Sequence, residues 1–272
     1  RTLLRFRDEP GFGRPVVITS ADSRFLIGEQ LAAVGVAADI ILEPSRQDSA
    51  AAVAVGARHV AASQPEALCL ILAADHMIND ASAFCAAALE AAQAARGGLI
   101  MTLGIQPTAP ATGYGYIAPG EAIAGTGSFR LKAFKEKPDA TTAARYIADG
   151  YLWNSGNFLF RPATMLSELE THAPAILAAA STAYDKATRD ADFIRLDAAT
   201  FATVPKTSID FAVMERTTKA GVTPYGSDWS DIGSWDALWE ASPKDSDGNV
   251  ITGDVQAIGV RNSLVQSEGL VT

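Results

Sequence analysis

The sequence predicts an α/β fold, a mostly parallel, Rossmann-like sheet that carries an antiparallel insertion. Over the first hundred residues, short apolar runs alternate with stretches of helical spacing, as they do in repeated strand–helix units. Such units call for a parallel sheet with right-handed crossovers. Beyond Gly104 the pattern changes to strands separated by turns, which is typical of antiparallel pairing.

The expected parallel strands are residues 15–19, 39–43, 68–73 and 99–103. The expected helices between them are residues 24–34, residues 48–62 and a segment that ends at Ala95. Gly35 stops the first helix and Pro44 closes the second strand. The run at 68–73 is continuously apolar, which predicts a strand covered by helices on both faces.

The insertion is expected to contain strands at 114–117, 129–135 and 151–160 and a helix at 140–149. Helical segments are expected between 162 and 187 and around 210–219. After Trp239 the composition becomes polar and contains glycine. We therefore expect one large domain over residues 1–241 and a short β-rich segment over residues 242–272. This segment is interpreted as the first turns of a β-solenoid, as a strand pair that closes the domain, or as a linker.

Composition excludes several classes of function. The chain has 272 residues, with 22 Lys+Arg against 31 Asp+Glu, a net charge of −9. This balance argues against a nucleic-acid partner, so a phosphorylated ligand would need local donors or a divalent cation. No apolar run approaches the roughly twenty residues of a membrane span, and no signal-peptide pattern is found. Cys69 and Cys85 are interpreted as reduced core residues of a cytoplasmic protein. The three isolated histidines argue against a zinc site.

Two aspartates are candidate metal ligands, because ligands of parallel sheets bind beyond the carboxyl ends of the strands. Asp75 directly follows the run at 68–73; the alternative is a turn residue that caps the next helix. Asp231 lies between Trp229 and Trp235, just before an expected helix; the alternative is a buried aromatic turn. If the two carboxylates meet across a cleft, they form a magnesium site for phosphoryl chemistry.

The insertion carries candidate sugar-phosphate ligands. Lys137 ends a charged triplet and would place a point charge on a phosphate, while Glu136 would accept from sugar hydroxyls. The alternative is a solvated strand end. Asn154 is a polar interruption of an expected strand beside Gly156, suited to hydroxyls, or else part of a bulge. Gly115 would let the backbone approach a ligand closely.

The start of the helix at 48–62 is a candidate nucleotide site. Its free N–H groups would face a phosphate or nucleotide beside Asp48 and Ser49. The alternative, favoured by local pattern alone, is plain capping of the helix by one of these two residues.

The order of these motifs resembles the sugar-nucleotide pyrophosphorylases, and specifically the bacterial mannose-1-phosphate guanylyltransferases. The resemblance covers nearly the whole chain. It rests on residues 43–44, 74–76, 103–116, 134–138, 152–156, 208–215, 229–235 and 247–249. The stretches Trp153-Asn154-Ser155-Gly156 and 208–215 are the most specific to the mannose branch.

The resemblance implies a nucleotidyltransferase sheet with a sugar-binding insertion, and transfer of GMP from GTP to α-D-mannose 1-phosphate, forming GDP-mannose and pyrophosphate. It implies that Asp75 and Asp231 bind Mg²⁺ and that Lys137 holds the sugar phosphate. Mannose would be bound by Glu136, Asn154 and Gly115, and the nucleotide near Asp48 and Ser49. The sugar phosphate attacks the α-phosphorus itself, so no protein nucleophile is expected.

The chain departs from the family pattern in three places. Asp48 replaces an asparagine and Ala111 replaces a glutamate. The family also opens with a first strand and a Gly-rich triphosphate loop, which we expect upstream of residue 1. Two alternatives stay open: a non-catalytic paralogue that binds nucleotide sugars, and a pyrophosphorylase for another hexose 1-phosphate. A homodimer is a further expectation.

Overall fold

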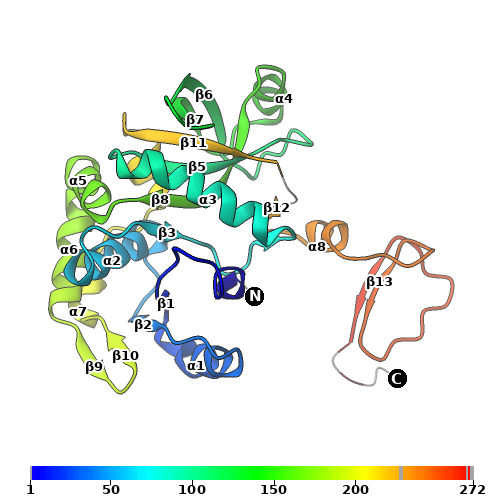
Figure 1. The fold of residues 1–272 in the computed structure, drawn as a ribbon. Helices are drawn as coiled ribbons and strands as arrows, with labels where there is room; N and C mark the ends of the chain where they lie inside the picture. The colour runs from blue at the N-terminus through cyan, green and yellow to red at the C-terminus, as the bar shows by residue number, and fades with distance from the viewer. Residues whose placement is uncertain (1, 227–228, 268, 270–272) are drawn as a thin grey trace. The chain divides into compact units, whose positions relative to one another are not determined.

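The computed structural model describes residues 2–226, 229–267 and 269 (Figure 1). The chain forms two compact units. The large unit comprises Arg1–Ala73 and Ala81–Gly226, and the small unit comprises Ala74–Asp80 and Ser227–Thr272. The domain boundary expected at residues 241–242 stays a prediction. Among the described residues, no helix is long and apolar enough to cross a membrane.

The large unit contains a four-stranded sheet in the order β1-β2-β10-β9. Its strands are β1 (Val16–Ser20), β2 (Asp39–Glu43), β10 (Phe193–Arg195) and β9 (Thr188–Asp190). The first three run parallel, and β9 pairs antiparallel with β10. In the β1–β2 ladder the last residues, Ser20 and Glu43, stand opposite one another, so both strands end at the same edge.

A second sheet of the large unit has six strands in the order β3-β8-β5-β11-β7-β6. They are β3 (Cys69–Ile71), β8 (Leu152–Phe160), β5 (Ile100–Ile105), β11 (Ala220–Tyr225), β7 (Phe129–Lys135) and β6 (Tyr116–Ala122). The pair β5–β11 is parallel. The pairs of β8 with β3, β5 and β6 are antiparallel, as are β6–β7 and β11–β7.

The expected α/β class with parallel elements is confirmed, and the directions of the ladders are mixed because β8 inserts between β3 and β5. Consequently β3 pairs antiparallel and two of its three residues are only half-buried, unlike the fully covered parallel strand that its apolar run predicted. Within the described residues β1 and β3 are both edge strands. The first strand expected upstream stays a prediction.

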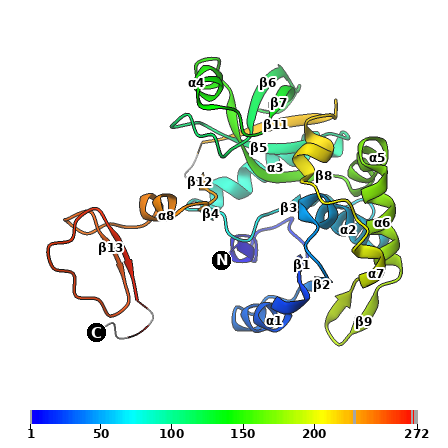
Figure 2. The same ribbon diagram turned by 180° about the vertical axis from the view of Figure 1, so that it is seen from behind.

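Helices cover the sheets of the large unit (Figures 1 and 2). They are α1 (Arg24–Ala33), α2 (Asp48–Ser63), α3 (Ala81–Arg96), α4 (Ala140–Ala148), α5 (Pro162–His172), α6 (Pro174–Asp185) and α7 (Ala198–Phe201). Short 3-10 turns form at η1 (Thr2–Arg5) and η2 (Ala21–Ser23), and a π-helical turn forms at η3 (Asp210–Met214). α3 lies along β5, β8 and β11, and α2 packs against α5 and α6.

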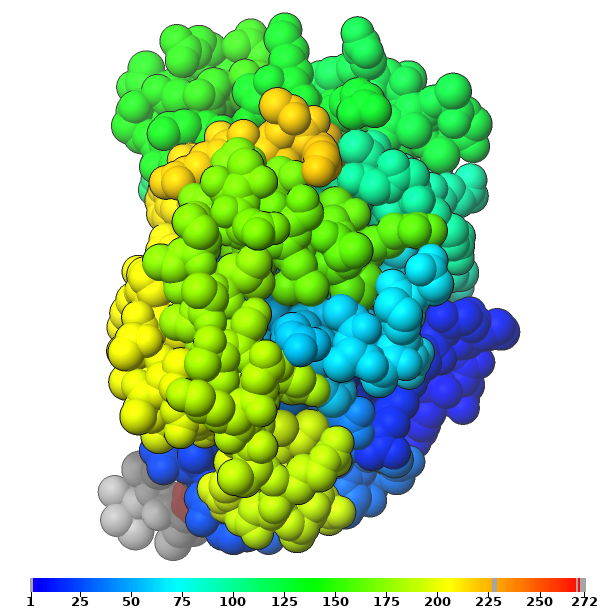
Figure 3. All heavy atoms as spheres, turned by 90° about the vertical axis from the view of Figure 1, so that its left-hand side faces the viewer, coloured from blue at the N-terminus to red at the C-terminus, as the bar shows by residue number. Residues whose placement is uncertain are grey.

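The main core lies around α2, because its alanines let neighbouring elements approach closely. The helix buries residues 50, 51, 53–57 and 59, and its buried alanines and valines pack with Met165 and Leu169 of α5 and with Ile176 of α6. Figure 3 shows the outer face of this cluster, where α5 and α6 (yellow-green) lie beside the part of α2 (light blue) that reaches the surface. At Gly56 an added Cβ would lie 3.3 Å from Ile18 Cδ1, so β1 packs tightly on this helix.

Among its described residues, the small unit holds two short ladders and one helix. The strands β4 (Met77–Ile78) and β12 (Trp229–Ser230) pair antiparallel, and α8 (Trp235–Ala241) follows. Ser234 caps α8 by accepting from the N–H of Ala237 at 3.0 Å. The strands β13 (Val250–Thr252) and β14 (Leu264–Gln266) pair parallel, the direction in which successive coils of a β-solenoid pair, so that alternative stays open.

Candidate active site

The first turn of α2 is anchored to the segment that precedes η3. The hydroxyl of Ser49 accepts a hydrogen bond from the N–H of Ile209 at 2.9 Å, and the N–H of Ala50 donates to the carbonyl of Thr207 at 3.2 Å. Asp48 opens the helix with a positive φ of 68°, and its carboxylate accepts from the N–H of Ser49 at 2.7 Å. These contacts place the start of α2 beside the residue that opens η3.

That residue is Asp210, which holds the side chain of Asn154. The Asn154 Nδ2 donates to Asp210 Oδ1 at 3.0 Å, and its Oδ1 accepts from the Thr102 hydroxyl at 2.8 Å. The Asn154 N–H donates to the carbonyl of Gly115 at 2.8 Å. The β5–β8 ladder also shifts register between Thr102 and Gly104, an irregularity of the kind that the alternative interpretation of Asn154 expected. The buried amide of Asn154 is oriented by its hydrogen bonds to Asp210 and Thr102.

Glu136 directly follows the end of β7, and its carboxylate lies next to Gly115. A Cβ added at Gly115 would lie 2.5 Å from Glu136 Oε2 and 3.3 Å from the Cβ of Asn154, so a side chain there would displace the carboxylate. Lys137 extends from a left-handed backbone with φ of 46° and lies 3.5 Å from Glu136 Oε1. The structure thus brings together Gly115, Glu136, Lys137 and Asn154, four of the residues expected to bind the sugar phosphate.

The carboxyl groups of this cluster are held away from water. Burial raises the pKa of Glu136, the nearby Asp210 raises it further, and Lys137 opposes the rise. Burial likewise raises the pKa of Asp210; its own backbone N–H, the Asn154 amide and Lys137 oppose the rise, while Asp48 adds to it. Two acceptor groups and one exposed ammonium therefore meet in one place, a combination that suits hydroxyl groups next to a phosphate.

Asp210 was missed as a functional residue by the sequence reasoning. It lies in the stretch 208–215, which carries the resemblance, but an aspartate at the start of a helical segment is typical of a cap. Asp210 opens the π-helical turn, in which the N–H of Glu215 donates to the carbonyl of Asp210 at 2.9 Å. Single π-turns often mark functional sites, and no periodicity in the sequence announces them.

The two candidate metal ligands lie in the small unit. In the β4–β12 ladder Ser230 pairs with Met77, so Asp231 follows one end of the ladder and Asp75 precedes the other strand by two residues. Trp229 Nε1 donates to His76 Nδ1 at 3.4 Å, which joins the two segments again. Asp231 Oδ1 accepts from the N–H of Gly233 at 3.0 Å. The short ladder therefore brings the segments that carry Asp75 and Asp231 next to one another.

This pair fits Mg²⁺ in the chemistry of its donors. Magnesium prefers hard oxygen ligands, keeps several waters and is commonly bound by one or two carboxylates together with substrate phosphates. Asp75 is exposed and Asp231 is half-buried, so water has access to the carboxylates. Within residues 2–226, 229–267 and 269, no group of three or more His, Cys, Asp or Glu side chains could hold a metal. A metal here would need ligands from substrate and solvent.

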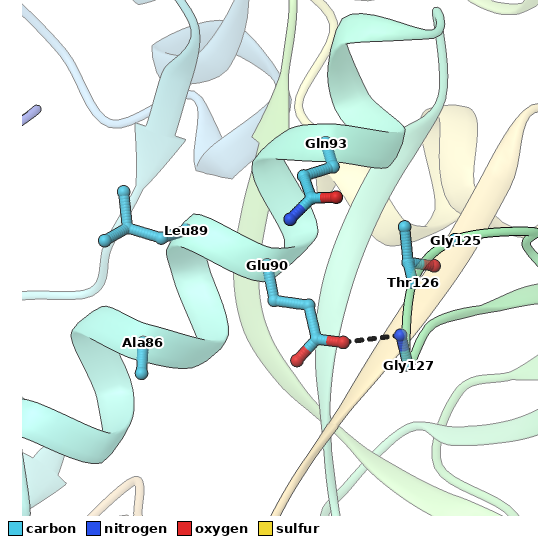
Figure 4. Close-up of a pocket in the computed structure, with 7 residues that line it drawn as sticks. All are labelled: Ala86, Leu89, Glu90, Gln93, Gly125, Thr126 and Gly127. Atoms are coloured by element: carbon cyan, nitrogen blue, oxygen red, sulfur yellow. Dashed lines mark hydrogen bonds between the residues drawn. The ribbon is translucent and has the colours of Figure 1, made fainter.

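A separate hollow of about 580 Å³ opens between α3 and the turn that joins β6 to β7 (Figure 4). It is lined by Ala86, Leu89, Glu90 and Gln93 on α3 and by residues 125–127 of the turn. Glu90 Oε1 already accepts from the N–H of Gly127 at 2.5 Å. None of the residues expected to bind substrate lines this hollow, so it is distinct from the cluster around Asn154.

Two curated relatives resemble the chain over most of its length. The "Mannose-1-phosphate guanylyltransferase" of Sinorhizobium fredii is 46% identical over 269 residues, 98% of this chain and 52% of the relative. The "Xanthan biosynthesis protein XanB" of Xanthomonas campestris is 45% identical over 259 residues, 94% of this chain and 55% of the relative. The chain therefore spans about half the length of these relatives.

Solved structures and a family model agree with this similarity. A crystal structure described as a mannose-1-phosphate geranyltransferase from Thermus thermophilus matches with a TM-score of 0.83 and 29% identity, covering 98% of this chain and 81% of that chain. The model of the nucleotidyl transferase family matches residues 5–248. The chain belongs to the nucleotidyl transferase family.

Proposed function

We propose that the chain transfers GMP from GTP to α-D-mannose 1-phosphate, forming GDP-mannose and pyrophosphate. The observation that carries the proposal is the cluster of Asn154, Glu136, Lys137 and Asp210 around Gly115. It sets hydroxyl-binding groups beside a cation in a member of the nucleotidyl transferase family. The identity of 46% to a relative named mannose-1-phosphate guanylyltransferase supports mannose 1-phosphate as the acceptor.

The residues of the cluster act by positioning. The ammonium of Lys137 holds the sugar phosphate as a point charge, while the carboxylate of Glu136 and the amide of Asn154 orient the sugar hydroxyls. Asp210 fixes the amide of Asn154 in place. A phosphate oxygen of the sugar phosphate then attacks the α-phosphorus of GTP in line and pyrophosphate leaves. Orientation and neutralisation of charge lower the barrier, so no protein nucleophile is needed.

Magnesium is the proposed cofactor, held by Asp75 and Asp231. Their carboxylate oxygens and the register of the β4–β12 ladder support this assignment. When bound, the ion neutralises phosphate charge that a chain of net charge −9 does not neutralise well by itself. The nucleotide is proposed to bind near Asp48 and Ser49 at the start of α2, where both side chains already make the local contacts described above.

The test is the rate of pyrophosphate release with a panel of substrates. Purified protein with Mg²⁺ is given mannose or glucose 1-phosphate, each with GTP, UTP or dTTP. The fastest release is expected with mannose 1-phosphate and GTP. Faster release with glucose 1-phosphate would establish the alternative hexose, and no release with any pair would establish the non-catalytic alternative. The retained pair Asp75 and Asp231 argues against the non-catalytic alternative, because a sensor has little need of both.

The biological setting follows from the same reaction. The name of the Xanthomonas campestris relative supports a role for the product in polysaccharide biosynthesis. The free, buried thiols of Cys69 and Cys85 support a cytoplasmic location, where thiols stay reduced. A homodimer is the proposed assembly, and light scattering of the purified protein would measure the mass of the particle directly.

A further inference from the structure

Glu215 takes the place of a strand partner at the end of β7. The β6–β7 ladder ends with Tyr116 opposite Lys135, so Glu136 lies just beyond the last pair. The other neighbour of β7, strand β11, pairs with it at Phe129 and Arg130, at the opposite end of the strand. The N–H of Glu136 instead donates to Glu215 Oε1 at 3.2 Å. A side-chain carboxylate therefore holds the backbone at the point where the ladder ends.

The π-helical turn η3 brings Glu215 to this position. The N–H of Glu215 donates to the carbonyl of Asp210, so one turn spans both residues. In an α-helix, residues five apart are turned from one another by about 140° and face different directions. The wider π-helical turn closes over the same five residues, and both carboxylates reach the cluster around Asn154. Asp210 accepts from the Asn154 amide, and Glu215 accepts from the Glu136 backbone.

The backbone that Glu215 holds is strained. Lys137, the residue after Glu136, has a positive φ of 46°, which non-glycine residues rarely adopt and which persists where surrounding contacts fix it. The Lys137 N–H donates to the carbonyl of Tyr114 at 3.2 Å, so the segment just before Gly115 holds one side of this turn. Glu215 holds the other side through the Glu136 N–H. Without Glu215, the carboxylate of Glu136 would lose a constraint on its place next to Gly115.

The ion pair of Glu215 with Lys135 does not explain its position. Their charged atoms lie 4.0 Å apart and the Lys135 side chain is 56% exposed, and ion pairs of this kind stabilise proteins little. Glu215 also lies close enough to Glu136 to raise the pKa of that carboxyl group, after the larger effects of burial and Asp210. A carboxylate so close to other carboxyl groups is electrostatically unfavourable. The hydrogen bond to the Glu136 N–H is therefore the interaction that accounts for Glu215, because carboxylates are strong acceptors.

We propose that Glu215 is a positioning residue: its carboxylate fixes the backbone of Glu136 and thereby sets the Glu136 carboxylate where it meets the sugar hydroxyls. The inference rests on the proposed transfer to mannose 1-phosphate. It gives the π-helical turn a function at both ends, since Asp210 at its start orients Asn154 and Glu215 directly after its end orients Glu136. The turn thus couples two hydroxyl-binding groups of the proposed site.

The experiment compares the steady-state kinetics of the wild type, E215A, E215Q and the control variant E170A. The glutamine of E215Q keeps an oxygen that can accept from the Glu136 N–H, whereas E215A removes it. Glu170 lies exposed on α5, so E170A removes a carboxylate outside the site and should match the wild type. E215A is expected to raise KM for mannose 1-phosphate by about tenfold, the effect of one lost hydrogen bond, and to change KM for GTP by at most about twofold. E215Q should stay within about threefold of the wild type for both substrates.

A double-mutant cycle shows whether Glu215 acts through Glu136. In the background of E136A the carboxylate to be positioned is absent, so adding E215A is expected to raise KM for mannose 1-phosphate by at most about twofold more. A further increase of about tenfold in that background would show that Glu215 acts independently of Glu136, and the inference would be overturned. Wild-type KM in E215A, equal losses in E215A and E215Q, or similar increases in KM for both substrates would overturn it as well.

Exchange of the Glu136 amide hydrogen, followed by NMR without substrates, tests the contact apart from the reaction. The exchange is expected to be at least about tenfold faster in E215A and close to the wild-type rate in E215Q and E170A. Unchanged exchange in E215A would contradict the positioning role. If the wild type is active and E215A keeps its KM, the inference alone fails. If the wild type forms no GDP-mannose, the proposed function fails and the inference fails with it.

Discussion

At the scale of single residues, Asp210 connects the groups that we assign to the sugar phosphate. Its carboxylate accepts from Asn154 and lies near enough to Glu136 and Lys137 to influence the charge of the site. Asp48 is also among the groups that act on it. A residue with these neighbours orients the amide of Asn154 and adds to the rise that burial causes in the pKa of Glu136.

D210N is expected to lower kcat/KM for mannose 1-phosphate by roughly 10- to 100-fold, because an amide in place of the carboxylate no longer fixes Asn154 in one orientation. The change should appear in steady-state kinetics, with separate values of kcat and KM. The control is D192N, in the exposed turn between β9 and β10, which should behave as the wild type. Wild-type kinetics for D210N would show that Asp210 does not position Asn154 for the substrate.

Gly115 provides a matched pair of variants. In G115A the new methyl group would lie 2.5 Å from Glu136 Oε2, so the carboxylate must move and KM for the sugar phosphate is expected to increase by about tenfold. G113A is the control, since an added Cβ there has no atom within 4 Å among the described residues. If both variants had the same KM, Gly115 would not be a close-approach position.

The raised pKa of Glu43 is expected to make the free energy of unfolding depend on pH. Its pKa is raised from 4.5 to about 7 in the folded protein, so folding favours its protonated form. Its contribution to the free energy of unfolding is therefore complete below about pH 4.5 and is lost as the pH rises through about 7. The shift corresponds to at most roughly 3 kcal/mol. Urea unfolding at about pH 5 and pH 8 should show a smaller loss of stability for E43Q than for the wild type; equal losses would contradict the assignment.

At the scale of elements, the hydrophobic pattern of the sequence was sufficient to predict those helices and strands that have one apolar face or one continuous apolar run. The strand expected at 39–43 is β2 and the strand expected at 129–135 is β7, with the same bounds. The helix expected at 48–62 is α2, which extends one residue further to Ser63. These elements are long or strongly apolar, so their period is readable without a partner.

The strands that the sequence analysis missed depend on distant partners. β11 contains Gly221 and Pro224, both unfavourable in strands, and it is stabilised by parallel pairing with the buried strand β5. β4 and β12 have two residues each and exist only as a pair. Local pattern has the same limit at the site. It singled out Asn154 and Glu136, but it could not single out Asp210, whose hydrogen bond is to Asn154, 56 positions away in the sequence.

The hydrogen bond that joins the start of α2 to the segment before η3 can be tested by mutation. S49A removes the acceptor of the Ile209 N–H and is expected to lower the free energy of unfolding by about 1 kcal/mol. It should also raise KM for mannose 1-phosphate, because Asp210 follows Ile209 directly. S63A, at the other end of α2, removes a hydroxyl that donates only to His59 of the same helix and should leave KM unchanged. An unchanged KM in S49A would show that this junction does not position the residues proposed to bind the sugar phosphate.

At the scale of the whole molecule, the residues proposed to act in the reaction are divided between the two units. The large unit carries the proposed sugar-phosphate cluster, and the small unit carries both aspartates proposed to bind Mg²⁺. For the proposed reaction between two phosphorylated substrates, a chain with a net charge of −9 requires neutralisation of phosphate charge beyond the ammonium of Lys137. We therefore expect the proposed guanylyl transfer to depend on Mg²⁺, on Asp75 and Asp231, and on the cluster around Asn154.

The most direct test is the formation of GDP-mannose from GTP and mannose 1-phosphate, followed by chromatography at increasing Mg²⁺, for the wild type, D75N, D231N and the control D236N. Asp236 lies exposed on α8 and has no assigned role. We expect product only with the divalent ion, a loss of roughly 100-fold or more in D75N and D231N, and wild-type rates in D236N. Product formed equally well without a divalent ion, or by both aspartate variants, would contradict it.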